Sequence, residues 1–129
     1  MIEFFFVYGT LKKGYSNNEL LKTSQFLGKA ITLENYKLYT CGFPMALYSP
    51  DDLPVLGELY RVESENVIKN LDRLEGNGIF YSRKQIKVKL LDFFDQVLTA
   101  WIYEIPDTKF GYSGFCDINK DYNAWEWKR

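Results

Sequence analysis

The carboxyl group of Glu75 is the side chain in this sequence best suited to proton transfer. Glu75 follows Leu71 by four residues and Ile68 by seven, so it continues the apolar stripe of a predicted helix and points toward the core. Desolvation and the negative end of the helix dipole both disfavour its anion, which raises the pKa of the carboxyl toward neutrality. A carboxyl group tuned in this way can accept and return a proton near neutral pH.

Spacing alone leaves other interpretations of Glu75 open. Asp72 lies three residues earlier on the adjoining helix face, which allows a pair of carboxylates. Glu75 could equally be a boundary residue that turns into water, or one that forms an ion pair with Arg73 or Arg83. Ion pairs also perturb pKa values, so the pattern indicates a functional carboxylate without establishing one.

The absence of histidine narrows the possible chemistry. The 129 residues contain no His and two Cys, Cys41 and Cys116. Ser-His-Asp hydrolysis, Cys-His catalysis and His-based zinc sites are therefore excluded. With no cluster of metal ligands in view, we expect neither a metal nor a cofactor. The two distant cysteines favour free thiols in a reducing cytoplasm over a disulfide, and we expect a cytoplasmic protein.

A glycine-bounded loop, Gly9-Thr10-Leu11-Lys12-Lys13-Gly14, follows the first apolar segment. Glycine at the end of a strand can expose successive backbone N–H groups toward an anion. The two glycines have the spacing of a P-loop, but Tyr15-Ser16 occupy the positions where Lys and Ser or Thr are required, so nucleotide binding is rejected. A carboxylate ligand would still suit the loop, although an ordinary tight turn explains the loop equally well by itself.

Composition excludes two classes of partner. The formal net charge is −1, and Lys12-Lys13 is too short a basic run for a nucleic-acid site. The longest wholly apolar run, Phe4 to Tyr8, is far too short to cross a bilayer, which takes roughly 20 residues. Aromatic residues make up 18% of the chain, enough to line a pocket as well as to fill a core.

The elements that must position these residues read as a single α+β domain over residues 1–129. We expect strands over residues 2–8, 55–62, 85–91 and 97–105, and an extended segment over 26–39 that Gly28 and Asn35 interrupt. The sheet should be curved or closed to protect its edges. A short helix is expected at 19–22, capped by Asn17 or Asn18. Ser64 should cap a longer helix that Gly76 and Gly78 end. The helical stripe of Val67, Ile68, Leu71 and Leu74 should face the core. The tail from Pro106 should pack back onto the body, because it carries Tyr112, Tyr122, Trp125 and Trp127.

Five motifs together resemble the γ-glutamylcyclotransferase-like family, including its avirulence-induced-gene-like and γ-glutamylamine cyclotransferase branch. They run the full chain in the family's order and spacing: Phe6-Val7-Tyr8-Gly9-Thr10-Leu11-Lys12-Lys13-Gly14, Gly42-Phe43-Pro44, Val55-Leu56-Gly57-Glu58-Leu59-Tyr60, Leu71-Asp72-Arg73-Leu74-Glu75-Gly76 followed by Tyr81 and Arg83, and Asp121-Tyr122 with Trp125. The resemblance implies a small mixed β-barrel of five to seven strands, flanked by one longer helix and one or two short ones.

The resemblance also implies an activity and its residues. A small γ-glutamyl compound would cyclise to 5-oxoproline and release an amine, with Glu75 as the general acid and base. The resemblance assigns substrate binding to Tyr8, Gly9, Thr10, Leu11, Tyr81 and Arg83, where the backbone amides of residues 9–11 hold the α-carboxylate and the developing oxyanion. The chemistry needs no metal or cofactor.

The loop sequence resembles the γ-glutamylamine branch, which favours an alkyl leaving amine over a leaving amino acid. Tyr8, Phe43, Tyr81 and Tyr103 are the expected apolar walls for such a stem, while Arg83 or Lys12 could supply a cation for a second carboxylate. Two alternatives remain: a non-catalytic protein that binds a small acidic or amide ligand on the same fold, and a structural or interaction domain with an exposed aromatic patch.

Overall fold

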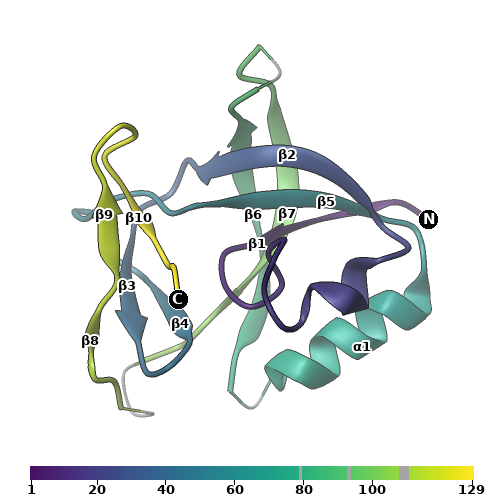
Figure 1. Cartoon of the computed structure of the whole chain (residues 1–129), viewed down its shortest axis with the longest axis horizontal. Coiled ribbons are helices and arrows are strands. Elements are labelled where there is room, and N and C mark those ends of the chain that lie inside the picture. Colours follow the sequence, from purple (N-terminus) through teal and green to yellow (C-terminus); the bar gives the residue numbers. More distant parts are fainter. Residues whose placement is uncertain (79, 93, 108–110) are drawn as a thin grey trace.

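A closed five-stranded barrel forms the centre of the computed structural model, which describes residues 1–78, 80–92, 94–107 and 111–129. The strands follow the order β1-β5-β2-β6-β7, and all neighbours are antiparallel except β7 and β1, which close the barrel in parallel. The predicted α+β mixed barrel is therefore confirmed (Figure 1). The elements are β1 Glu3–Val7, η1 Asn18–Leu21, β2 Gln25–Thr32, β3 Tyr36–Thr40, β4 Pro44–Tyr48, β5 Leu56–Val62, α1 Glu65–Glu75, β6 Ser82–Leu90, β7 Val97–Glu104, β8 Gly114–Phe115, β9 Asp117–Asn119 and β10 Ala124–Glu126.

Two glycines shape the barrel where β5 and β2 pass their neighbours. A Cβ atom on Gly57 would lie 2.4 Å from the carbonyl oxygen of Val7 and 2.7 Å from Cζ of Phe6, so only glycine lets β5 approach β1 so closely. Gly28 has a φ of 138° and lies at a shift of register between β2 and β5, which bends β2. The extended segment predicted for 26–39 forms two strands in different sheets, because the chain bends at residues 33–35, where Asn35 is one of the two predicted interruptions.

The helix α1 packs its apolar stripe on one end of the barrel. The Ser64 hydroxyl caps it by accepting a hydrogen bond from the N–H of Val67 at 3.4 Å, as the sequence predicts. Gly76, with a φ of 60°, ends it in the left-handed conformation. Val67, Ile68 and Leu71 are buried, but the prediction for Leu74 is wrong. Leu74, in the last turn of the helix, is 41% exposed.

The short predicted helix at 19–22 is a 3₁₀ turn, η1, which lies beside α1 in Figure 1. Asn17 stands at its N-cap but makes no capping bond with its side chain. The Asn17 amide instead donates to the hydroxyl of Thr10 at 2.8 Å, which ties η1 to the loop after β1.

The C-terminal tail returns to the body of the protein through its tryptophans. Trp125 and Trp127 are 9% and 5% exposed, whereas Tyr112 and Tyr122 are 49% and 43% exposed, so the tail packs back as predicted, with the tryptophans as its buried residues among these four. β9 and β10 form a hairpin, and a second small sheet has the order β4-β3-β8 (Figure 1). No helix in the described ranges is long and apolar enough to cross a membrane.

Candidate active site

A cavity of about 370 Å³ opens between the loop after β1, the turn before β4 and the C-terminal end of α1. This volume lies within the range of small-molecule sites. The residues that line the cavity are Phe6, Val7, Tyr8, Gly9, Thr10, Leu11, Asn17, Phe43, Pro44, Arg73, Leu74, Glu75, Gly76, Phe80, Tyr81 and Tyr103.

Glu75 is the acidic residue of this lining and the last residue of α1. Its backbone is fixed by the glycine cap and by the N–H of Tyr81, which donates to the Glu75 carbonyl at 3.3 Å. Desolvation raises the pKa of the Glu75 carboxyl from 4.5 to about 7. Among the described residues, none forms a hydrogen bond or ion pair with this carboxylate.

The alternative partners of Glu75 are engaged elsewhere. The Arg73 guanidinium donates to the side-chain oxygen of Asn70 at 3.4 Å. The Arg83 guanidinium forms an ion pair with Asp72, with 3.1 Å between Nε and Oδ1. Asp72 does not line the cavity, so the structure does not bring the two carboxylates of the helix together in one site. Glu75 is left as a half-buried carboxyl in the lining of the cavity.

The successive residues Gly9, Thr10 and Leu11, each of which carries a backbone N–H group, belong to the same lining. No acceptor from the described part of the chain pairs with them, while the next amide, that of Lys12, donates to the carbonyl of Gly9 at 3.0 Å. This turn is held by η1, since the Asn17 N–H donates to the carbonyl of Thr10 at 2.9 Å. Unpaired amides in succession suit an anion, and here they share a cavity with Glu75.

Tyrosine side chains form much of the cavity wall, but their hydroxyl groups are already bonded. The Tyr8 hydroxyl donates to the carbonyl of Tyr103 and accepts from the N–H of Ala46, and the Tyr81 hydroxyl donates to the carbonyl of Pro44 at 2.6 Å. Burial, reinforced by neighbouring acidic groups that include Glu75, raises the pKa of both phenols well above their usual value. These rings therefore act as neutral walls.

Two predicted cations lie outside the cavity. Arg83 packs against Trp101, with its guanidinium carbon 4.3 Å from the ring centroid, and holds Asp72, which also accepts from the Tyr103 hydroxyl at 2.7 Å. Lys12 is 6% exposed and donates to the backbone carbonyl of Trp127 at 2.6 Å. Arg83 thus contacts Asp72 and Trp101, Lys12 contacts Trp127 in the C-terminal tail, and neither residue lines the cavity.

The predicted wall of Tyr8, Phe43, Tyr81 and Tyr103 is present in the structure, but sequence reasoning missed other lining residues. Arg73 and Leu74 directly precede Glu75, and this proximity in the sequence could have identified them as lining residues. Leu74 was assigned to the core instead. The other missed positions, all but Asn17, lie within two residues of a predicted site or wall residue: Phe6, Val7, Asn17, Pro44, Gly76 and Phe80. Within the described ranges, no group of three Asp, Glu or Cys side chains could hold a metal ion.

Residues 5–126 of the chain match the family described as "Gamma-glutamyl cyclotransferase, AIG2-like". A Methanocaldococcus jannaschii protein with a provisional γ-glutamylcyclotransferase name is 37% identical over 108 residues, which cover 83% of this chain and 88% of that protein. The γ-glutamylaminecyclotransferase of Rattus norvegicus is 33% identical over 97 residues, covering 68% of this chain and 64% of the rat protein. The crystal structure of an AIG2-like protein from Mus musculus superposes with a TM-score of 0.74 at 26% identity, covering 99% of this chain and 97% of the mouse chain.

Proposed function

The chain belongs to the γ-glutamyl cyclotransferase, AIG2-like family, and we propose that it catalyses the ring closure of small γ-glutamyl compounds. The α-amine of the glutamyl group attacks its own γ-carbonyl carbon, and the new C–N bond closes the ring of 5-oxoproline. The bond from that carbon to the leaving nitrogen breaks, while one proton moves from the attacking amine to the leaving amine. Because the nucleophile is tethered, orientation alone can supply an effective molarity of about 10⁵ to 10⁸ M.

Glu75 moves the proton in this scheme. Its carboxylate accepts the proton as the α-amine attacks, and the resulting acid protonates the leaving nitrogen. A pKa of about 7 suits both steps, since each form is present near neutral pH. The observation that carries the proposal is this half-buried carboxyl, which has no partner in the described part of the chain and shares a cavity with the residues that carry the unpaired amides.

The amides of Gly9, Thr10 and Leu11 provide the electrostatic part of the reaction. Their residues line the cavity that the substrate would occupy, and in this proposal the amides hold its α-carboxylate and the oxyanion that develops on the γ-carbonyl. Preorganised donors of this kind stabilise developing charge without rearranging during the reaction. No cofactor or metal enters any of these steps.

The leaving group in our proposal is an amine with an apolar stem. Phe43 and Leu74 line the cavity and remain 38% and 41% exposed, so they offer apolar surface for such a stem. A leaving amino acid would bring a second carboxylate. In the described lining, the one cationic side chain that could pair with this carboxylate is Arg73, which is exposed. We therefore expect kcat/KM to be higher for a γ-glutamyl-lysine isopeptide than for γ-glutamyl-alanine or glutathione. A tenfold or greater preference for γ-glutamyl-alanine would refute the amine assignment and leave the cyclisation intact.

A cytoplasmic location is part of the proposal. Cys41 and Cys116 form no disulfide, as expected of a protein in a reducing compartment.

Release of 5-oxoproline from a panel of γ-glutamyl compounds tests the proposed reaction. Glu75→Gln should fold normally and lose about two orders of magnitude in kcat, the usual scale for a general acid–base group. Glu65→Gln is the matched control, because it removes an equal charge from the exposed first turn of the same helix. Wild-type turnover by a folded Glu75→Gln protein would refute the role. Binding of 5-oxoproline without turnover of any compound would favour the non-catalytic alternative.

A further inference from the structure

Lys12 is a buried cation that the proposed reaction does not use. Its side chain is 6% exposed, and its ammonium lies 5.2 Å from the ring centroid of Tyr15 and 6.0 Å from that of Trp127. Burial lowers its pKa, although the charges of Glu126 and Glu58 partly oppose the effect. An ammonium removed from water in this way needs strong compensating contacts, and within the described part of the chain it donates a hydrogen bond to the backbone carbonyl of Trp127 at 2.6 Å.

That carbonyl belongs to a firmly held part of the tail. Trp125, two residues earlier, donates from its backbone N–H to the carbonyl of Pro54 at 2.8 Å and from its indole to the carbonyl of Tyr36 at 2.7 Å. The Trp127 side chain is itself 5% exposed. The carbonyl oxygen of Trp127, which accepts the hydrogen bond from the Lys12 ammonium, is thus fixed with respect to the barrel.

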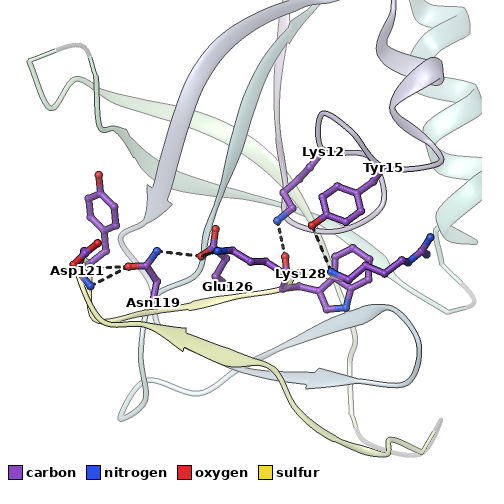
Figure 2. Close-up of polar contacts among 9 residues, drawn as sticks. Lys12, Tyr15, Asn119, Asp121, Glu126 and Lys128 are labelled. Carbon is purple, nitrogen blue, oxygen red and sulfur yellow. Dashed lines mark hydrogen bonds and ion pairs between the residues drawn. The ribbon is translucent and has the colours of Figure 1, made fainter.

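The other end of the contact is the turn that presents the unpaired amides. Lys12 follows Leu11 directly, and its own N–H closes the turn on the carbonyl of Gly9. A second link runs in parallel, since the Tyr15 hydroxyl accepts from the N–H of Arg129 at 3.4 Å and its ring lies 5.1 Å from that of Trp127. Figure 2 shows Lys12 and Tyr15 side by side, both directed at the last residues of the chain.

We propose that Lys12 is a positioning residue, whose bond to the Trp127 carbonyl fixes the turn that aims the amides of residues 9–11 into the cavity. The tail at residues 125–129 thereby sets how well the loop binds the substrate's anionic groups. The inference rests on the proposed function for its effect on turnover, while its effect on the loop is independent of any activity.

Lys12→Met tests the proposal, because methionine keeps an unbranched apolar stem between the two rings and removes the donor. Lys13→Met is the matched control: it removes the same charge from the next residue, whose side chain is exposed. We expect Lys12→Met to raise KM and lower kcat/KM at least tenfold with an unchanged pH profile. The amides of Lys12 and Asn17 should exchange hydrogen at least tenfold faster, and barrel amides should not change.

Failure of the positioning role of Lys12 can be distinguished from failure of the proposed cyclisation. If the wild-type protein turns over γ-glutamyl compounds but Lys12→Met matches it in kcat/KM and in amide exchange, the positioning role is wrong and the cyclisation stands. If the wild-type protein turns over nothing, the proposed function fails, and the exchange rates of the two loop amides still decide whether Lys12 holds the turn. A uniform rise in exchange over the barrel would assign Lys12 a role in global stability and overturn the proposal. Lys12→Leu serves as the second variant if methionine is not accommodated.

Discussion

Replacing Glu75 by glutamine should stabilise the protein at alkaline pH even though it removes the proposed catalytic group. The pKa of the folded carboxyl is about 7, raised by burial from 4.5. A carboxyl whose pKa is higher in the folded state than in the unfolded state binds its proton more tightly when folded. Its contribution to stability is therefore complete below pH 4.5 and is lost as the pH rises through 7. Glutamine does not lose stability in this way as the pH rises, because its side chain stays neutral.

The size of the effect follows from the two pKa values. At pH 5.0 the folded carboxyl is nearly all protonated, and at pH 8.0 about nine-tenths of it is ionised. Integrating the proton linkage between these limits gives a loss of about 2.5 kcal/mol in the free energy of unfolding. Urea unfolding of wild type and Glu75→Gln at both pH values isolates this term, because the other titrating groups cancel in the double difference. A double difference below about 0.5 kcal/mol would mean that Glu75 is solvated, and the argument for its raised pKa would fail.

Further predictions concern rate, loop and barrel. Because the proposed base must be ionised, kcat/KM should fall about tenfold per pH unit below pH 7, measured as 5-oxoproline release; a profile flat down to pH 5 would exclude a base of this pKa. Gly9→Ala should weaken binding of 5-oxoproline, because a Cβ atom would lie 2.8 Å from Cγ of Pro44 and one side must move; equal affinities in calorimetry would show that the turn adapts without cost. Gly57→Ala should destabilise the protein by several kcal/mol in urea unfolding, since the new methyl group meets the Val7 carbonyl, and a midpoint like that of wild type would contradict the close approach of β1 and β5. Turnover should survive EDTA, and loss of activity that a divalent ion restores would refute the proposed chemistry.

Local periodicity carried much of the prediction from sequence. The alternation of Ile86, Val88 and Leu90 identifies the inner face of β6, and all three are buried. The cap at Ser64 and the stop at Gly76 locate α1 correctly because each acts through backbone geometry within one turn. The placement of Glu75 at the cavity follows from the same helical count, so its position was accessible without a structure.

Long side chains escaped prediction because their direction depends on distant partners. Lys12 and Arg83 were both available to a substrate on sequence grounds, yet Lys12 reaches a carbonyl 115 residues away and Arg83 turns to Asp72 and Trp101. The role expected of Gly9 also changes in the structure. Its backbone has no positive φ, and the constraint is instead the proximity of Pro44, whose Cγ would lie 2.8 Å from a Cβ atom on Gly9. Such constraints arise where segments from separate sheets meet, and sequence spacing does not report them.

The cavity contains few groups able to exchange a proton near neutral pH, which makes the role of Glu75 testable without ambiguity. The titratable residues of the described lining are three tyrosines, Arg73 and Glu75. Burial raises the pKa of every one of these tyrosines well above 10, and their hydroxyls already donate to backbone carbonyls or to Asp72. A guanidinium stays protonated throughout the working range. An ionisation near pH 7 that belongs to the free enzyme and disappears in Glu75→Gln must therefore be that of Glu75, whereas one that persists in the variant would require a proton-transfer group outside this lining.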